Sequence, residues 1–229
     1  MELGLITGLS FFLAVMSFAV IEIRNLGRAT NLYTLQTLTL VLIFLAIAWE
    51  HSIGTLYIWA GTAFLTKVLI VPFLILMIIR KTGVKHEEAP FGGLFHPFIS
   101  LGVSIAVAIM LEPIFIRFSL LKLQIPIIVS IFVFMMGILG LVFRKSAVKQ
   151  ILAYCLFENG AHLTLALTAY NAPETVEMGI LTDAIFSVII MGALAMRFFH
   201  HFGSLDTSQA NELKRSEEHT SELQSLRHL

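Results

Sequence analysis

The chain has few of the residues that build redox centres or soluble enzyme domains. It contains one cysteine, Cys155, and no spacing that suggests a zinc, haem or iron–sulfur site. A lone cysteine can form no intrachain disulfide and cannot hold a cluster by itself. Nucleophile elbows and phosphate-binding loops are also lacking. We therefore expect no cofactor, no metal and no catalytic site of its own, so any redox chemistry belongs to partner subunits.

Charge is equally scarce. Only 13% of the 229 residues are charged and the formal net charge is zero, whereas about 25% are charged in ordinary soluble domains. No basic field exists to attract nucleic acid, and the short loops offer no place for a soluble small-molecule substrate. What the chain has instead is apolar sequence, at 57% hydrophobic residues and a mean hydropathy of +0.88.

These apolar residues come in runs of about 20, the length needed to cross a hydrocarbon core of ~30 Å. The sequence predicts an all-α, polytopic membrane bundle of about seven transmembrane helices. Pro113 is expected to kink or end the fourth helix, and the loop from Arg80 to His96 is expected to connect two halves at the membrane surface. The predicted spans are 4–23, 31–49, 56–79, 97–116, 124–143, 148–170 and 176–197.

Residues 1–205 form this predicted bundle and 206–214 a short cytoplasmic tail. The string RSEEHTSELQS, within 215–229, is what translation of a sequencing adapter yields, so we interpret 215–229 as an artefact. The first span has no basic leader or cleavage site and is interpreted as a retained helix. A weak parallel repeat relates 1–80 to 121–200 at a shift of 120 to 121 positions. This shift aligns Arg24 with Arg144 or Lys145, Tyr33 with Tyr154, and Thr62 with Thr182.

The lysines and arginines of the short loops predict an orientation. Nine lie on one side and two, Arg117 and Lys122, on the other. Because cytoplasmic loops carry the excess of basic residues, this bias places the amino terminus outside and the carboxyl terminus in the cytoplasm. The nine are Arg24, Arg28, Arg80, Lys81, Lys85, Arg144, Lys145, Lys149 and Arg197.

Three ionisable residues fall within the predicted spans: Lys67, Glu158 and Asp183. A charge at the bilayer centre costs ~2.5–3.5 kcal/mol, so such a residue is retained with a partner, a polar cavity or a function. We expect all three to lie at similar depth. Lys67 should face the bundle interior near a carboxylate, either as a counter-charge or as a charge that gates proton movement.

Glu158 is the strongest candidate for proton chemistry. His162 lies four residues later on the same helical face, and Asn159 and Gly160 allow close approach of another helix or water. An apolar setting favours the neutral forms of both Glu158 and His162, which makes proton exchange near neutral pH possible. The alternative is a structural contact of Glu158 with Lys67 or His162 that fixes helix register.

The same two readings, relay and structural contact, apply to Asp183, whose oxygens Thr182 or Ser187 could satisfy locally. Gln36 is interpreted as an interhelical hydrogen-bonding group. The remaining candidates lie at helix ends or in loops and are expected on solvated faces: His86, Glu87, Glu88, His200 and His201.

Two strings, IGTLYIWAGTAFLTKVLIVPF and YCLFENGAHL, resemble component E of hydrogenase 4, the formate hydrogenlyase type, and the resemblance spans 1–214. The last three spans are also similar to the small K subunit of bacterial respiratory complex I, including the basic pair Arg144 and Lys145. The resemblance implies a multi-pass subunit of a bacterial or archaeal inner membrane, in which Glu158 and Asp183 belong to a line of charged groups.

Three hypotheses follow. The leading one is a membrane-arm subunit of a hydrogenase-like or NADH dehydrogenase-like complex, with Glu158, Asp183, Lys67 and His162 as a proton relay. The second is a non-conducting scaffold that assembles antiporter-like partners. The third, an independent transporter, is disfavoured because no discontinuous helices of the inverted-repeat kind are predicted. In the first two, the partners are other membrane subunits and the lipid bilayer.

Overall fold

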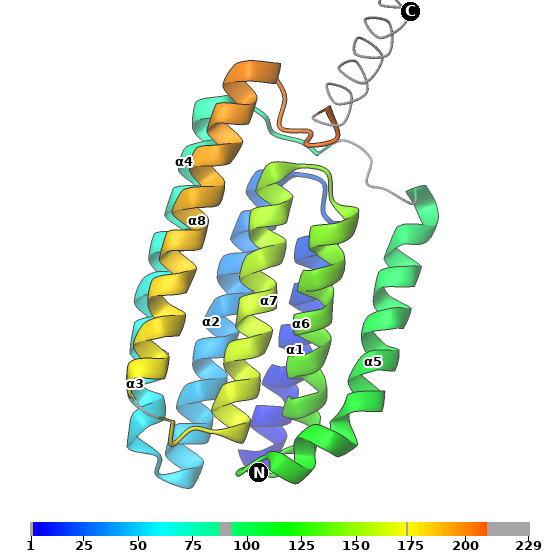
Figure 1. The fold of residues 1–229 in the computed structure, drawn as a ribbon. Coiled ribbons are helices and arrows are strands. Elements are labelled where there is room, and N and C mark those ends of the chain that lie inside the picture. Colours follow the sequence, from blue (N-terminus) through cyan, green and yellow to red (C-terminus); the bar gives the residue numbers. More distant parts are fainter. Residues whose placement is uncertain (1, 88–92, 173, 210–229) are drawn as a thin grey trace, which may run out of the picture.

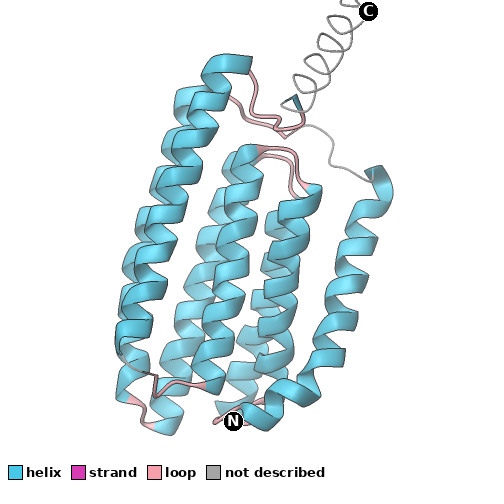
Figure 2. Cartoon of the chain, in the orientation of Figure 1, coloured by secondary structure: helices cyan, strands magenta, loops and turns pink. Residues whose placement is uncertain are grey.

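The computed structural model describes residues 2–87, 93–172 and 174–209, and this part of the chain is helical (Figures 1 and 2). Seven long helices are present in it, and the third is continuous but contains a π-helical segment. A short 3-10 helix, η2, covers Gly93–Phe95. The long elements are α1 Glu2–Glu22, α2 Leu26–His51, α3 Gly54–Ala63 with η1 Phe64–Ile70 and α4 Val71–Thr82, α5 His96–Phe118, α6 Gln124–Phe143, α7 Ala147–Thr168 and α8 Glu174–Phe202.

Each predicted span falls on one of these helices, so the all-α class and the number of helices are confirmed. Six of the helices are both long and apolar enough to cross a membrane, and the protein is a multi-pass membrane protein. The exception is α7, whose apolar character is interrupted by Glu158, Asn159 and His162. Residues 210–229, including the suspected adapter sequence, lie outside the described part.

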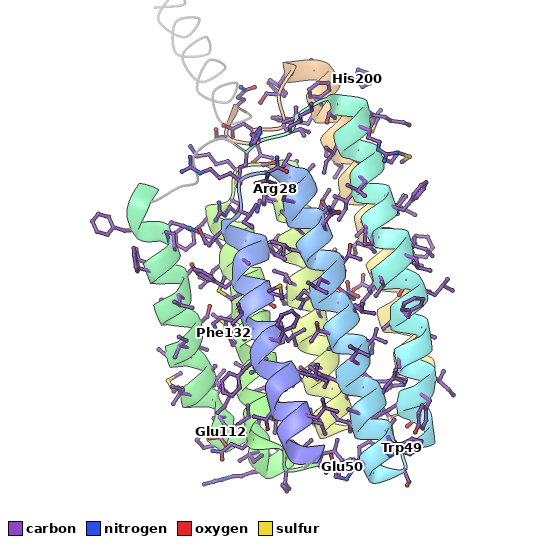
Figure 3. The ribbon with its side chains drawn as sticks, turned by 180° about the vertical axis from the view of Figure 1, so that it is seen from behind. Arg28, Trp49, Glu50, Glu112, Phe132 and His200 are labelled. Carbon is purple, nitrogen blue, oxygen red and sulfur yellow. The ribbon has the colours of Figure 1, made fainter. Side chains whose placement is uncertain are left out.

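The helices form two layers and one flanking helix. Helices α6, α7 and α8, here the C-terminal layer, lie in front in Figure 1, and α1, α2 and the α3–η1–α4 helix, the N-terminal layer, lie behind. Figure 3 shows the same order from the other side. Contacts between the layers join α1 to α6, α2 to α7 and α4 to α8, and α5 packs against α6. The core therefore lies between the layers.

Two short backbone latches close one end of the bundle. Around a single β-bridge between Asn25 and His86, the chain before α5 pairs with the turn between α1 and α2. A second bridge, between Ser146 and Asp206, ties the chain after α8 to the turn between α6 and α7. Figure 3 places Arg28 and His200 at this end, and Trp49, Glu50 and Glu112 at the opposite end. We call the former the latch end.

Glycines set the spacing between α6 and α7. A Cβ atom on Gly137 would lie 2.3 Å from the backbone nitrogen of Phe157, and one on Gly160 would lie 2.4 Å from that of Phe134. Real Cβ atoms do not approach backbone this closely, so only glycine allows the two helices to pack at this distance. The predicted close helix approach at Gly160 is confirmed.

The flanking helix α5 continues through Pro113 to Phe118. Figure 1 shows it bending toward its C-terminal end, so the proline kinks the helix and does not end it. Only 17% of the residues in the apolar stretch of α5 are buried inside the protein, and only 22% of those in the apolar stretch of α8. These two helices therefore present most of their surface to the bilayer or to other subunits.

Candidate functional site

A buried ion pair joins the two layers near the middle of the bundle. Lys67 Nζ lies 3.4 Å from Glu158 Oε1, and the two side chains are 2% and 8% exposed. Lys67 belongs to η1 in the N-terminal layer and Glu158 to α7 in the C-terminal layer. The prediction that Lys67 faces the interior near a carboxylate is confirmed, because each charge supplies the partner that the other needs in an apolar setting.

The π-helical segment that carries Lys67 has a local cause. Pro72 has no N–H and its ring would clash with the carbonyl of Val68, so α-helical bonding cannot continue through this turn. The N–H of Val71 instead bonds to the carbonyl of Thr66, five residues earlier. Such an insertion changes the direction of the side chains before it relative to those after it, and π-helical turns frequently occur at functional sites.

His162 lies one turn beyond Glu158 in a cage of aromatic rings. Its ring centroid is 4.9 Å from that of Phe44 in an edge-on arrangement and 5.3 Å from that of Trp59. Both ring nitrogens are buried, and neither has a hydrogen-bond partner within the described residues. His162 is thus placed on the same helix face as Glu158, as expected. Of the two structural contacts considered for Glu158, the one with Lys67 is present, and no hydrogen bond joins Glu158 to His162 within the described residues.

Asp183 lies beside the central pair and does not contact it. Its Oδ2 accepts a hydrogen bond of 3.1 Å from Tyr154 Oη. Ser187 Oγ lies 3.1 Å from Oδ1, so the expected local satisfaction by Ser187 is confirmed. Tyr154 is one turn before Glu158 on α7, which brings Asp183 to a neighbouring level. Unlike Glu158, Asp183 is exposed on the surface of the chain.

A network of neutral side chains links α7 to α2 and α1 next to the ion pair. Asn159 Nδ2 donates hydrogen bonds to Gln36 Oε1 at 2.9 Å and to Thr37 Oγ1 at 3.1 Å. Gln36 Nε2 in turn donates to Ser17 Oγ at 3.2 Å. The prediction for Gln36 is confirmed. Because all four residues are buried, the network fixes the rotation of α7 and hence the direction of Glu158.

A second buried ionic cluster lies at the latch end. Arg144 is 1% exposed, with Nη1 donating to Glu87 Oε2 at 3.0 Å and Nη2 2.9 Å from Glu22 Oε2. His96 Nδ1 lies 3.3 Å from the other oxygen of Glu22. Burial raises the pKa of the Glu87 carboxyl, and the charges of Arg144 and Lys149 oppose that rise. The cluster holds α1, α5, α6 and the first latch together.

Sequence reasoning missed this cluster. Glu87 was expected on a solvated face, and that expectation is wrong because Arg144 draws its carboxylate into the protein. No buried contact was predicted for Arg144 or Lys149, which were counted among the basic residues of the loops, yet both are buried. Lys149 Nζ donates to the carbonyls of Val20 and Ile21, at 2.6 and 3.0 Å, and so caps the C-terminal end of α1.

The other candidate groups show no special arrangement. His86, His200 and His201 are exposed, as predicted, and Glu88 lies outside the described residues. Cys155 is buried as a free thiol. Among the described residues, no three His, Cys, Asp or Glu side chains lie close enough together to hold a metal ion.

Comparison with known proteins now places the chain. Hydrogenase-4 component E of Escherichia coli is 34% identical over 211 residues, which is 92% of this chain and 97% of that protein. Its counterpart in Shigella flexneri matches equally well. The chain belongs to the hydrogenase-4 component E family. An uncharacterised protein of Mycobacterium tuberculosis is 34% identical over 71 residues, 31% of this chain and 32% of that protein.

A sequence model of the NADH-ubiquinone/plastoquinone oxidoreductase chain 4L family also matches this component E homologue, at residues 125–215. That match covers the C-terminal layer, including Glu158 and Asp183. It does not include the N-terminal layer, which carries Lys67. The resemblance to the small complex I subunit is therefore confirmed for the last three long helices. No solved structure matches the chain.

Proposed function

We propose that this component E homologue is a membrane-arm subunit of a hydrogenase-4-like oxidoreductase complex, and that Glu158 exchanges protons during redox-coupled proton translocation. The observation that carries the proposal is the Lys67–Glu158 pair. Both residues lie near the middle of helices long enough to span the bilayer, and both are buried. A cation beside a carboxylate stabilises its charged form, whereas burial stabilises its neutral form.

These opposing effects leave Glu158 able to take up and release a proton when its surroundings change. A displacement of Lys67 or the arrival of another charge would tip the balance between the two forms. The proposed next groups of the relay are His162, one helical turn from Glu158 on α7, and Asp183 on α8, which is hydrogen-bonded to Tyr154, one turn before Glu158. The chain binds no cofactor in this proposal, so the redox reaction takes place on partner subunits.

We further propose an inner-membrane location with the latch end in the cytoplasm, because nine loop or helix-end basic residues gather at that end. The sparsely buried α5 and α8 are the surfaces for antiporter-like partner subunits. Asp183 supports this role for α8, because its carboxylate is exposed on the surface of the chain. If that carboxylate faced lipid, it would carry the full cost of ~2.5–3.5 kcal/mol, whereas a partner subunit could cover it.

The test is Glu158→Gln in the intact complex, with proton uptake into sealed vesicles measured during redox turnover. Glutamine keeps the volume and hydrogen-bonding capacity of glutamate but cannot exchange a proton. We expect the complex to assemble while coupled proton translocation falls severalfold, and Glu158→Asp to retain part of it. Glu112→Gln, at the far end of α5, is the matched control and should leave translocation unchanged.

A non-conducting scaffold predicts the reverse order. The neutral amide would then preserve the packing and the shorter aspartate would disturb it, so Glu158→Gln would translocate normally and Glu158→Asp would lose assembled complex. That result would overturn the proposal.

A further inference from the structure

The two latches at the end of the bundle are built identically. Each has one β-bridge and two backbone hydrogen bonds, and every residue of the second latch follows its counterpart in the first by 120 or 121 positions. The matched bridges are Asn25 with His86 and Ser146 with Asp206. The matched hydrogen bonds are Leu26 to Lys85 and Ala147 to Leu205, both 3.0 Å, and Glu87 to Arg24 and Thr207 to Lys145, both 2.9 Å.

The helices before and between the latches follow the same shift. Helix α1 ends at Glu22 and α6 at Phe143, and α2 begins at Leu26 and α7 at Ala147. The third helix of each layer agrees at both ends, since 54–82 corresponds to 174–202. Four long helices, the last of them α5, separate the start of α1 from the start of α6. Because four is an even number, α6 runs in the same direction as α1. The two layers are thus parallel, as the sequence repeat requires.

Each helix also lies against its own counterpart: α1 against α6, α2 against α7 and α4 against α8. One layer is therefore stacked on the other in register. Chance similarity of apolar helices accounts for helix length, but not for the same bridge and the same pair of loop hydrogen bonds at a shift of 120 or 121 positions.

At the centre the layers have diverged. The counterpart of Glu158 is Thr37 and that of Asp183 is Ala63, so the N-terminal layer has no carboxylate at either position. The counterpart of Lys67 is Ser187, which leaves the cation only in the N-terminal layer. The N-terminal layer thus has no acidic group at these two positions and carries the basic residue that faces Glu158.

We propose that residues 2–87 are a second, diverged three-helix unit of the type that the chain 4L family model matches at 125–215, and that this unit is a built-in partner whose task is to hold Lys67 against Glu158. Without the N-terminal layer, the face of α7 that carries Glu158 would lie open. The stacked layer covers that face and places the positioning cation there permanently.

The role given to Lys67 rests on the proposed function, whereas the equivalence of the two layers does not. Two experiments on the full chain in its complex separate them. The first moves the cation by one residue, in the double variant Lys67→Thr with Thr66→Lys, which keeps composition and charge but takes the ammonium away from Glu158. Lys67→Arg is the conservative comparison.

The readout is the pH profile of redox-coupled proton translocation. Without a facing cation the charged form of Glu158 is less stable, so the profile of the relocated variant should move to higher pH, while Lys67→Arg should keep the native profile. A relocated variant with the native profile and native assembly would overturn the positioning role of Lys67.

The second experiment introduces cysteine pairs into the latches. Bridge partners have Cα atoms ~4.5–5.5 Å apart, within reach of a disulfide. Asn25→Cys with His86→Cys and Ser146→Cys with Asp206→Cys should both form disulfides. The register controls, with position 84 in place of 86 and 204 in place of 206, should form none. Disulfide formation at 146/206 but not at 25/86 would overturn the equivalence, whatever Glu158→Gln shows.

Discussion

The N-terminal and C-terminal layers agree most closely at the latch end and differ most in the middle of the bundle. At the latch end both use the same backbone bridge, whereas at the centre one presents Lys67 and the other Glu158. Backbone pairing tolerates almost any side chain, so a latch persists while sequences diverge. A buried charged residue cannot be replaced so freely, because its loss leaves the oppositely charged partner in the other layer buried and uncompensated.

The layers also pack internally in different ways. In the C-terminal layer Gly137 and Gly160 bring α6 and α7 together, and the corresponding positions in the N-terminal layer are Met16 and Thr39. The closely packed pair carries the proposed proton-exchanging residue. A tightly fixed α7 holds Glu158 in one orientation, and the comparison therefore predicts greater sensitivity to substitution in the C-terminal layer.

The largest effect is expected from Arg144→Met at the latch end. It leaves the carboxylates of Glu22 and Glu87 without their buried partner, and breaking such a pair typically costs about 3–5 kcal/mol. The thermal midpoint of the solubilised complex and the yield of assembled complex should both fall strongly. Ile23→Met, at the corresponding position of the N-terminal layer, should change neither.

Adding Glu87→Gln to Arg144→Met should recover part of the lost stability, because it removes one uncompensated charge. A single Arg144→Met variant with native yield and thermal midpoint would show that the cluster is not what holds the layers at this end.

A smaller loss of stability is expected from Gly137→Val. The new side chain meets the backbone of Phe157, and overpacking of this kind costs about 1–3 kcal/mol. The yield of folded chain after solubilisation should fall. Gly8→Ala on α1, where a Cβ atom would meet nothing within 4 Å, is the control and should be neutral. An equal yield of folded chain from the Gly137→Val and Gly8→Ala variants would contradict the proposed difference in packing between the layers.

The smallest effect is expected from Asp183→Asn. The side chain is exposed on the chain and held by neutral hydroxyl groups, so the amide can keep these contacts. Assembly should be unchanged and proton translocation should fall less than in Glu158→Gln. If Asp183→Asn abolished translocation while Glu158→Gln left it intact, the two carboxylates would have to exchange their proposed roles.

Much of this molecule was predictable from the sequence because the bilayer restricts what an apolar run can do. Spans of about 20 residues must be helices, and a lysine among leucines must find a carboxylate, which led to Lys67 and Glu158. The shift of about 120 positions on which the proposed equivalence of the two layers rests can also be read from the sequence, where it aligns Tyr33 with Tyr154.

The rest depends on which distant segments meet. Nothing near Arg144 in the sequence indicates that Glu22 and Glu87 surround it, and a basic residue at a helix end ordinarily lies in solvent. Asp183 is separated from the central pair by the register between α7 and α8. An error of one helical turn in a predicted register would place Asp183 next to the pair instead. Pro72 was the available signal for the π-helical segment, since it forbids normal bonding one turn earlier.

The double variant Lys67→Met with Glu158→Gln tests the central claim most directly. It replaces a buried ion pair by neutral side chains of similar size, a change that such pairs often tolerate without loss of stability. The measurement is the number of protons translocated per electron pair by the intact complex in sealed vesicles. We predict native assembly and native redox activity with severalfold fewer protons per electron pair. Native proton translocation in this variant would show that the pair only holds the layers together.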